Sequence, residues 1–143
     1  MLDLTMDRKL DPKVAVLGEE IGMAQAPEIE QMVDPVNEWD NQPIPETRRG
    51  HANAHGDGAV GMDTTMPGVM SGKEMEALES TRGAEFESKW LTVTIEHHQG
   101  AIEVASTEKD QGEDKEAKAL AEDIVEAQGD QVETMETLKV ADR

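Results

Sequence analysis

Cysteine and tyrosine are absent from this 143-residue sequence, and aromatic residues make up only 2% of it. Without thiols the chain has no disulfide, no thiolate metal site and no cysteine nucleophile. Any metal ion must therefore be bound by histidine, methionine, aspartate or glutamate. With so few aromatic residues, the core has to consist of Leu, Ile, Val, Ala and Met, a composition typical of helices rather than of β-sandwiches.

Basic residues are also scarce. The chain has 13 Lys and Arg residues against 32 Asp and Glu residues, which gives a formal net charge of -19. Such a charge opposes binding to nucleic acid and to anionic lipid, and it attracts cations. No apolar run approaches the roughly 20 residues of a membrane-spanning helix, and the first residues do not form a signal peptide. We therefore expect no nucleic-acid partner and no membrane insertion.

Helical periodicity dominates the chain, because apolar residues recur every three or four positions over long stretches. The pattern predicts a short helical tail over 1–9 and three long helices over 12–39, 71–110 and 115–140. Residues 40–70 are rich in Gly, Pro, Asn and Asp and show no sustained period. They are predicted to form a linker.

Local signals mark where these helices begin and bend. Asp11 and Asp114 are suitable N-caps, and the sequence SGKE (71–74) forms a capping box. Pro27 and Pro35 predict a kink or a break in the first long helix, since proline removes a backbone hydrogen bond.

The chain contains an internal repeat, in which residues 1–32 align without gaps with residues 104–135. Identical residues at this one offset are Asp7/Asp110, Asp11/Asp114, Leu17/Leu120, Glu19/Glu122, Ile21/Ile124, Ala24/Ala127, Gln25/Gln128, Glu30/Glu133 and Met32/Met135. Each repeat has the pattern of a helical hairpin. Two hairpins predict an all-α fold of the four-helix-bundle type.

In this register the counterpart of the sequence HHQGAIE would precede Met1. We therefore expect the chain to begin inside the first repeat, with the first helix largely missing; the alternative is an irregular first helix. The predicted organisation is one bundle domain that comprises the C-terminal part of the first repeat (1–39), the linker (40–70) and the second repeat (71–143). A missing helix would leave an apolar groove, which a second copy could fill as a homodimer.

Several motifs together resemble the bacterial domain-of-unknown-function family 305. They are MPGVMS (66–71), EF (85–86), HHQGAIEVA (97–105), LAEDIVEAQ (120–128) and the closing Met135. The resemblance implies a ferritin-like helical bundle, often duplicated and often exported, so the expected location is secreted or otherwise extracytoplasmic. It also implies a role in metal binding, of copper especially.

This sequence departs from the family pattern at four positions. Val69, Thr94 and Val104 stand where the family commonly has methionine, and Glu87 stands where it commonly has aspartate. Because thioethers favour Cu(I), the loss of three methionines weakens the expectation of copper for this chain.

His97 and His98 are the leading candidates for metal ligands, and both are predicted to face the bundle interior. Further candidate ligands are Met70, Met75, Gln128 and Met135. The expected cofactor is a copper ion, with zinc as the alternative. A structural role is also open, in which the imidazoles donate to Gln128 or to a carboxylate and fix the packing. His51 and His55 lie in the Gly-containing linker and are predicted to be solvated.

The sequence carries none of the motifs that indicate an enzyme. The Glu-x-x-His pairs of di-iron bundles, HExxH, GxSxG and Gly-rich phosphate loops are all absent. The sequence therefore predicts a non-enzymatic protein that binds or buffers a transition metal. The competing hypothesis is a helical scaffold or interaction domain whose histidines are structural.

Overall fold

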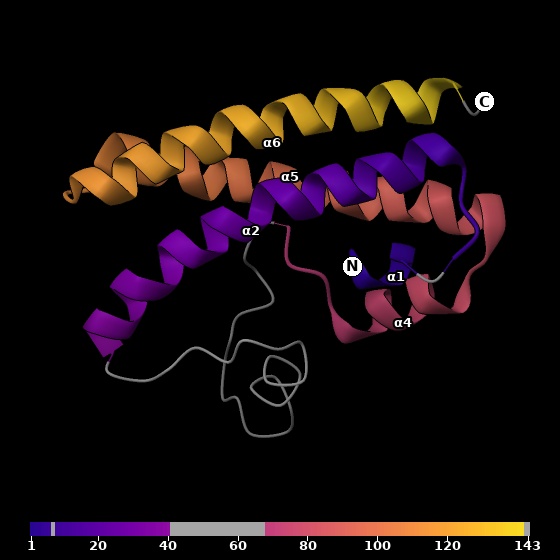
Figure 1. Ribbon diagram of the computed structural model, residues 1–143, viewed down its shortest axis with the longest axis horizontal. Helices are drawn as coiled ribbons and strands as arrows, with labels where there is room; N and C mark the ends of the chain where they lie inside the picture. Colours follow the sequence, from indigo (N-terminus) through magenta and orange to yellow (C-terminus); the bar gives the residue numbers. More distant parts are fainter. Residues whose placement is uncertain (7, 41–67, 142–143) are drawn as a thin grey trace.

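The computed structural model describes residues 1–6, 8–40 and 68–141, and in these ranges the chain forms five helices and no strand (Figure 1). The helices are α1 (Asp3–Met6), α2 (Pro12–Asp40), α4 (Gly72–Ser80), α5 (Gly83–Gln111) and α6 (Lys115–Ala141). The predicted all-α bundle is confirmed. Most of the predicted linker, with His51 and His55, lies outside the described residues.

The predicted starts of three helices are confirmed by their capping bonds. Asp11 Oδ1 accepts a hydrogen bond from the backbone N–H of Lys13 at the start of α2. Asp114 Oδ1 accepts from two backbone N–H groups at the start of α6. At α4 the hydroxyl of Ser71 accepts from the N–H of Glu74, whose carboxylate accepts from the N–H of Ser71. These bonds satisfy N–H groups that have no partner inside the helix.

The long helix predicted over 71–110 is two helices, α4 and α5. The chain leaves helical geometry at Thr81, which is extended with φ −85° and ψ 163°, and α5 begins at Gly83, whose φ of +57° is left-handed. Both the N–H and the hydroxyl of Thr81 donate to the carbonyl of Leu78. The polar side chain of Thr81 thus offers the backbone an alternative to the helix, and Gly83 adopts the left-handed conformation that reverses the chain.

The first long helix is continuous. α2 extends through Pro27 and Pro35, so of the kink or break predicted at these prolines the break is wrong. Figure 1 shows that its N-terminal half lies along α6 and α5, whereas its C-terminal half diverges from them.

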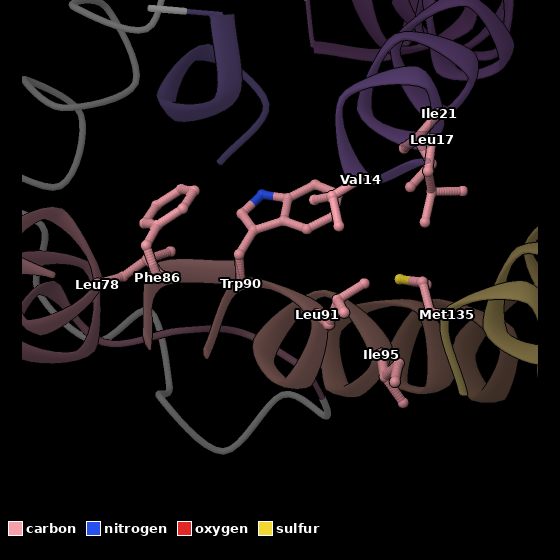
Figure 2. Packing of buried hydrophobic residues seen from close by; sticks show 9 residues of the cluster. All are labelled: Val14, Leu17, Ile21, Leu78, Phe86, Trp90, Leu91, Ile95 and Met135. Carbon is pink, nitrogen blue, oxygen red and sulfur yellow. The ribbon is translucent and has the colours of Figure 1, made fainter. Parts of the chain in front are cut away.

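One hydrophobic core joins all five helices. Figure 2 shows its buried members on α2, α4, α5 and α6. Phe86 and Trp90 are fully buried at its centre on α5. The other buried members are Val14, Leu17 and Ile21 on α2, Leu78 on α4, Leu91 and Ile95 on α5, and Met135 on α6, while Leu2 and Leu4 of the N-terminal segment pack against the cluster. The few aromatic residues thus lie where several elements meet, which is where large side chains bury most area.

Polar contacts attach the N-terminal segment to the same core. The guanidinium of Arg8 lies 4.0 Å from the centroid of the Phe86 ring and donates to the carbonyls of Thr81, at 2.6 Å, and Glu79, at 3.0 Å. The buried carboxylate of Glu87 accepts from the backbone N–H of Asp11 at 2.8 Å. Arg8 therefore satisfies carbonyls at the end of α4, and Glu87 fixes the start of α2 on α5.

Replacing Phe86 with alanine tests whether this core is shared. Phe86→Ala should lower the free energy of unfolding by about 3–5 kcal/mol, because it leaves a cavity and removes the ring under Arg8. Urea unfolding followed by circular dichroism measures the change. Ser88→Ala, at an exposed position on the same helix, should change it by less than about 0.5 kcal/mol. Equal effects of the two variants would contradict the shared core.

Candidate functional site

The two adjacent histidines lie in different environments. His98 is 1% exposed and faces α6, whereas His97 is exposed. The prediction that both face the interior is therefore wrong for His97. Successive residues on an α-helix point about 100° apart, so one helix cannot bury both rings against the same neighbour. The ring centroids are 6.2 Å apart and the ring planes form an angle of 67°.

His98 is oriented by a hydrogen bond across the α5–α6 interface. Its Nε2 lies 2.8 Å from Oε1 of Gln131. Since an amide oxygen only accepts, Nε2 carries the proton and Nδ1 is left with a lone pair. Nδ1 is buried and has no hydrogen-bond partner of ordinary geometry among the described residues. Histidines that ligate metals commonly have this arrangement, with one ring nitrogen held by an oxygen and the other free.

The environment of His98 favours the neutral ring. Burial is the largest effect and lowers the pKa of His98, and the charge of nearby His97 lowers this pKa further. Two effects weaker than burial raise the pKa of His98. The larger of them is the hydrogen bond to Gln131, and the smaller is an interaction with the backbone of Thr94. The imidazole is therefore neutral at neutral pH, which is the protonation state that metal binding would require.

Further buried polar atoms on α5 and α6 have no hydrogen-bond partners in the described part of the chain. They are Nε1 of Trp90, Oγ1 of Thr94 and Oε1 of Gln128. Trp90, Thr94 and His98 follow one another at steps of four, so they lie on one side of α5. Gln128 stands one turn before Gln131 on α6. Buried groups of this kind ordinarily bind water or a ligand, which makes the α5–α6 interface the best candidate for a polar site.

His97 fixes the segment that leads into α4. Its Nδ1 lies 3.0 Å from the carbonyl of Gly68, so this nitrogen donates and Nε2 keeps the lone pair. Gly68 has φ +76°, and a Cβ at this position would lie 2.8 Å from the carbonyl oxygen of Glu96 and 2.9 Å from that of His97. Only glycine permits both this backbone conformation and this close approach. The glycine of the MPGVMS motif thus contacts the first histidine of the HHQGAIEVA motif.

The other predicted ligands are distributed unevenly. Gln128 is buried in the α5–α6 interface, whereas Met135 is a fully buried member of the hydrophobic core. Met70 and Met75 are half-buried. Within the described residues no group of three or more histidine, aspartate and glutamate side chains is placed to hold a metal ion. In the described part of the chain, the two imidazoles therefore have no carboxylates beside them that would complete a set of three metal ligands.

Sequence reasoning missed two residues that position the histidines. Gln131, and not Gln128, is the partner of His98, and Gly68 is the partner of His97. Gln131 lies between Gln128 and Met135 at helical spacing, so it belonged to the same inward stripe and was a detectable candidate. No spacing rule pointed to Gly68, because the contact connects segments 29 residues apart.

A separate open groove of about 420 Å³ lies between the start of α2 and the end of α6. Its wall is mainly carbon and includes Val16, Leu17 and Leu138. The lining residues include no histidine or methionine, so the groove is distinct from the candidate metal ligands.

Replacing Gly68 with alanine tests the contact between the two motifs. Gly68→Ala should cost about 1–3 kcal/mol of stability, because the added Cβ meets backbone and the positive φ becomes strained. It should also remove the hydrogen bond of His97 Nδ1, which the ¹⁵N chemical shifts of the ring report. Gly72→Ala is the control, since a Cβ there meets nothing within 4 Å. A stable Gly68→Ala protein with unchanged His97 shifts would contradict this arrangement.

A second prediction concerns pH. Because folding lowers the pKa of His98, the unfolded chain binds the proton more readily, and stability should fall as the pH decreases below about 6.5. Denaturant unfolding from about pH 7 to about pH 5 should therefore show a shallower slope of stability against pH for His98→Gln than for the unmodified protein. Gln99→Ala, at an exposed position on α5, should keep the original slope. Identical slopes for all three proteins would show that His98 is not held neutral.

No helix in the described ranges is both long enough and apolar enough to cross a membrane. Comparison with curated proteins gave no match. Among solved structures, a DUF305 protein from Streptomyces coelicolor, named as a candidate secreted protein, is similar with a TM-score of 0.77 and 23% identity. That match covers 99% of this chain and 82% of the other.

A DUF305 fragment from Deinococcus radiodurans is similar with a TM-score of 0.74 and 26% identity, over 98% of this chain and 85% of the other. These likenesses support the same helical fold. The sequence profile described as "Domain of unknown function (DUF305)" matches residues 1–139. Because this match spans nearly the whole length, the chain belongs to the domain-of-unknown-function family 305.

Proposed function

We propose that this protein binds a transition-metal ion through His98, with His97 as the second imidazole, and that it acts by binding rather than by catalysis. The observation that carries the proposal is the state of the His98 ring. Its Nε2–H is held by Gln131, while Nδ1 is buried and has no partner of ordinary geometry in the described chain. An oriented, neutral imidazole is the commonest protein ligand for such ions.

The spacing of the two rings is close to what a shared ion needs. Two imidazoles on one ion have centroids roughly 5–6 Å apart, because each metal–nitrogen bond is about 2.0–2.1 Å long. The centroids of His97 and His98 are 6.2 Å apart. The hydrogen bond of His97 Nδ1 to Gly68 leaves Nε2 as its ligand atom. Binding of one shared ion would require both rings to reorient, with Nδ1 of His98 and Nε2 of His97 as the ligand atoms.

The remaining ligands would be neutral oxygens. The hydroxyl of Thr94 lies one turn before His98, is 2% exposed as a residue and has no partner in the described chain. Nitrogen and oxygen ligands bind Cu(II) more strongly than Zn(II). Copper in its divalent form is therefore the proposed ion and zinc the alternative, while Cu(I) is disfavoured because thioethers are missing at positions 69, 94 and 104.

Two further features support a metal-binding role. The net charge of -19 raises the local concentration of cations around the protein. One similar protein is named as a candidate secreted protein, and family resemblance implies the same for this chain, so we propose an extracytoplasmic location. With few fixed ligands, the affinity should suit buffering of a metal rather than its permanent retention.

A helical scaffold remains the competing function, and one observation favours it. The hydrogen bonds of the two histidines join α5 to α6 and to the segment before α4, which is a sufficient structural role for both rings. Metal titration separates the two functions, because a scaffold needs no ion.

The test is titration of the purified protein with Cu(II), Zn(II) and, under reducing conditions, Cu(I). We expect about one equivalent of Cu(II) to bind, more tightly than Zn(II). His98→Gln should weaken binding by more than about tenfold, and Gln131→Leu, which releases the ring, should weaken it roughly 10–100-fold. Isothermal titration calorimetry measures the affinities, and electron paramagnetic resonance of Cu(II) identifies nitrogen ligands.

A double variant of the two other histidines, His51→Gln/His55→Gln, is the matched control and should bind as the unmodified protein does. If this control loses the ion while His97→Gln/His98→Gln retains it, the proposed ligands are wrong. If no ion binds to any of the proteins, the scaffold function takes the place of metal binding.

A further inference from the structure

The C-terminal half of α2 presents an apolar face that no described element covers. Ile29 is 54% exposed and Met32 is 42% exposed. Both lie on the side of α2 that buries Leu17 and Ile21 further back, since steps of three and four connect these positions. Figure 1 shows why the burial stops: α2 diverges from α5 and α6 beyond its midpoint. The core-facing side of the helix thus continues into solvent.

The internal repeat identifies what this face resembles. Met32 corresponds to Met135 of α6, and Gln25 corresponds to Gln128. On α6 these positions are buried against α5, with Met135 at 0% and Gln128 at 7% exposure. On α2 Gln25 is half-buried and Met32 is 42% exposed, so neither residue is buried as its counterpart on α6 is. In the other half of the protein, side chains of the same types are therefore covered by a helix.

The charge of this part of the chain restricts which helix fits. Between residues 14 and 40 the sequence has seven acidic residues, Glu19, Glu20, Glu28, Glu30, Asp34, Glu38 and Asp40, and no lysine, arginine or histidine. Glu28 stands at the position that corresponds to Gln131, the partner of His98 on α6. Partial burial and the charge of Asp123 raise the pKa of Glu28, so a nearby cation would relieve an unfavourable carboxylate. A second copy of this chain, with the same charge of -19, is a poor match.

We propose that the face formed by Gln25, Glu28, Ile29 and Met32 docks a cationic amphipathic helix of a partner protein. Apolar side chains of that helix pack on Ile29 and Met32, as α5 packs on α6. A lysine or arginine of the partner pairs with Glu28. This is the helix-in-groove mode of recognition, with affinity from apolar anchors and selectivity from charge.

The test uses designed peptides as probes. A fluorescein-labelled peptide of about 18 residues, long enough for five helical turns, carries leucines on one face and lysines on the other. A scrambled isomer has the same composition without the apolar face, and a third peptide has glutamate in place of every lysine. Fluorescence anisotropy should show binding of the first peptide, binding at least about tenfold weaker of the scrambled isomer and no binding of the acidic peptide.

Variants locate the binding face. Ile29→Glu/Met32→Glu should weaken binding of the lysine peptide at least about tenfold, because each buried apolar anchor is worth about this factor. The matched control is Met23→Glu/Val140→Glu, which adds the same charge at residues that are 70% and 71% exposed elsewhere on the surface. It should leave the affinity unchanged or slightly increase it. Ile29→Gln/Met32→Gln repeats the test without added charge, and circular dichroism verifies that each variant folds.

Substitution of Glu28 tests the role of charge. Glu28→Gln should lower the affinity for the lysine peptide up to about fivefold at low salt, because one ion pair is lost. It should also reduce the salt dependence of binding.

Three outcomes would overturn the proposal. The first is equal binding of the lysine peptide and its scrambled isomer. The second is an equal response of the Ile29/Met32 variants and the Met23/Val140 control. The third is a concentration-dependent dimer, seen by sedimentation, that Ile29→Gln/Met32→Gln dissociates, because the face would then belong to a second copy.

Discussion

Burial of Phe86 and Trp90 on α5 is the interaction on which the rest of the described structure depends, because every other helix packs against the cluster around them. α2 and α6 contribute aliphatic side chains and Met135, while α4 contributes Leu78. With aromatic residues at 2% of the sequence, no second cluster of this kind can form. The helices therefore share one core, in which α4 and α6 lie against α5, α2 lies against α6, and α1 lies against α2.

The same packing gives the two histidines different roles. Because α6 covers one side of α5, His98 is buried and its ring is fixed by Gln131, whereas His97 lies on the surface and holds Gly68. One ring is thus isolated from solvent and kept neutral, and the other connects to a segment distant in sequence. The two histidines are adjacent in the sequence, but in the fold each makes a hydrogen bond to a different segment of the chain.

Much of the fold followed from the sequence, because helix periodicity and capping are local. Asp11, the 71–74 capping box and Asp114 marked true helix starts. The break at Thr81 was not predicted, since the apolar period continues through it and the interruption depends on side-chain bonds to the backbone. The helix also continues through Pro27, where a kink or a break was predicted, so the loss of one backbone hydrogen bond did not end it.

The candidate site was predicted less completely than the fold. Periodicity assigned His98 and Gln128 to the interface correctly, but it cannot decide which of two glutamines, one turn apart, a ring will reach. It also placed His97 inside, because an apolar stripe indicates a broad face and not the edge where burial ends. The Gly68 contact depends on where a distant segment crosses α5, and no local pattern encodes such a crossing.

The attachment of Arg8 has a consequence for how the protein opens. Chain termini are usually the first part of a domain to fray. Here the guanidinium bonds to carbonyls at the corner between α4 and α5, as far as 73 residues away in the sequence, and covers a ring at the centre of the core. The first residues and the α4–α5 corner should therefore unfold together, as one cooperative unit whose opening exposes the centre of the core.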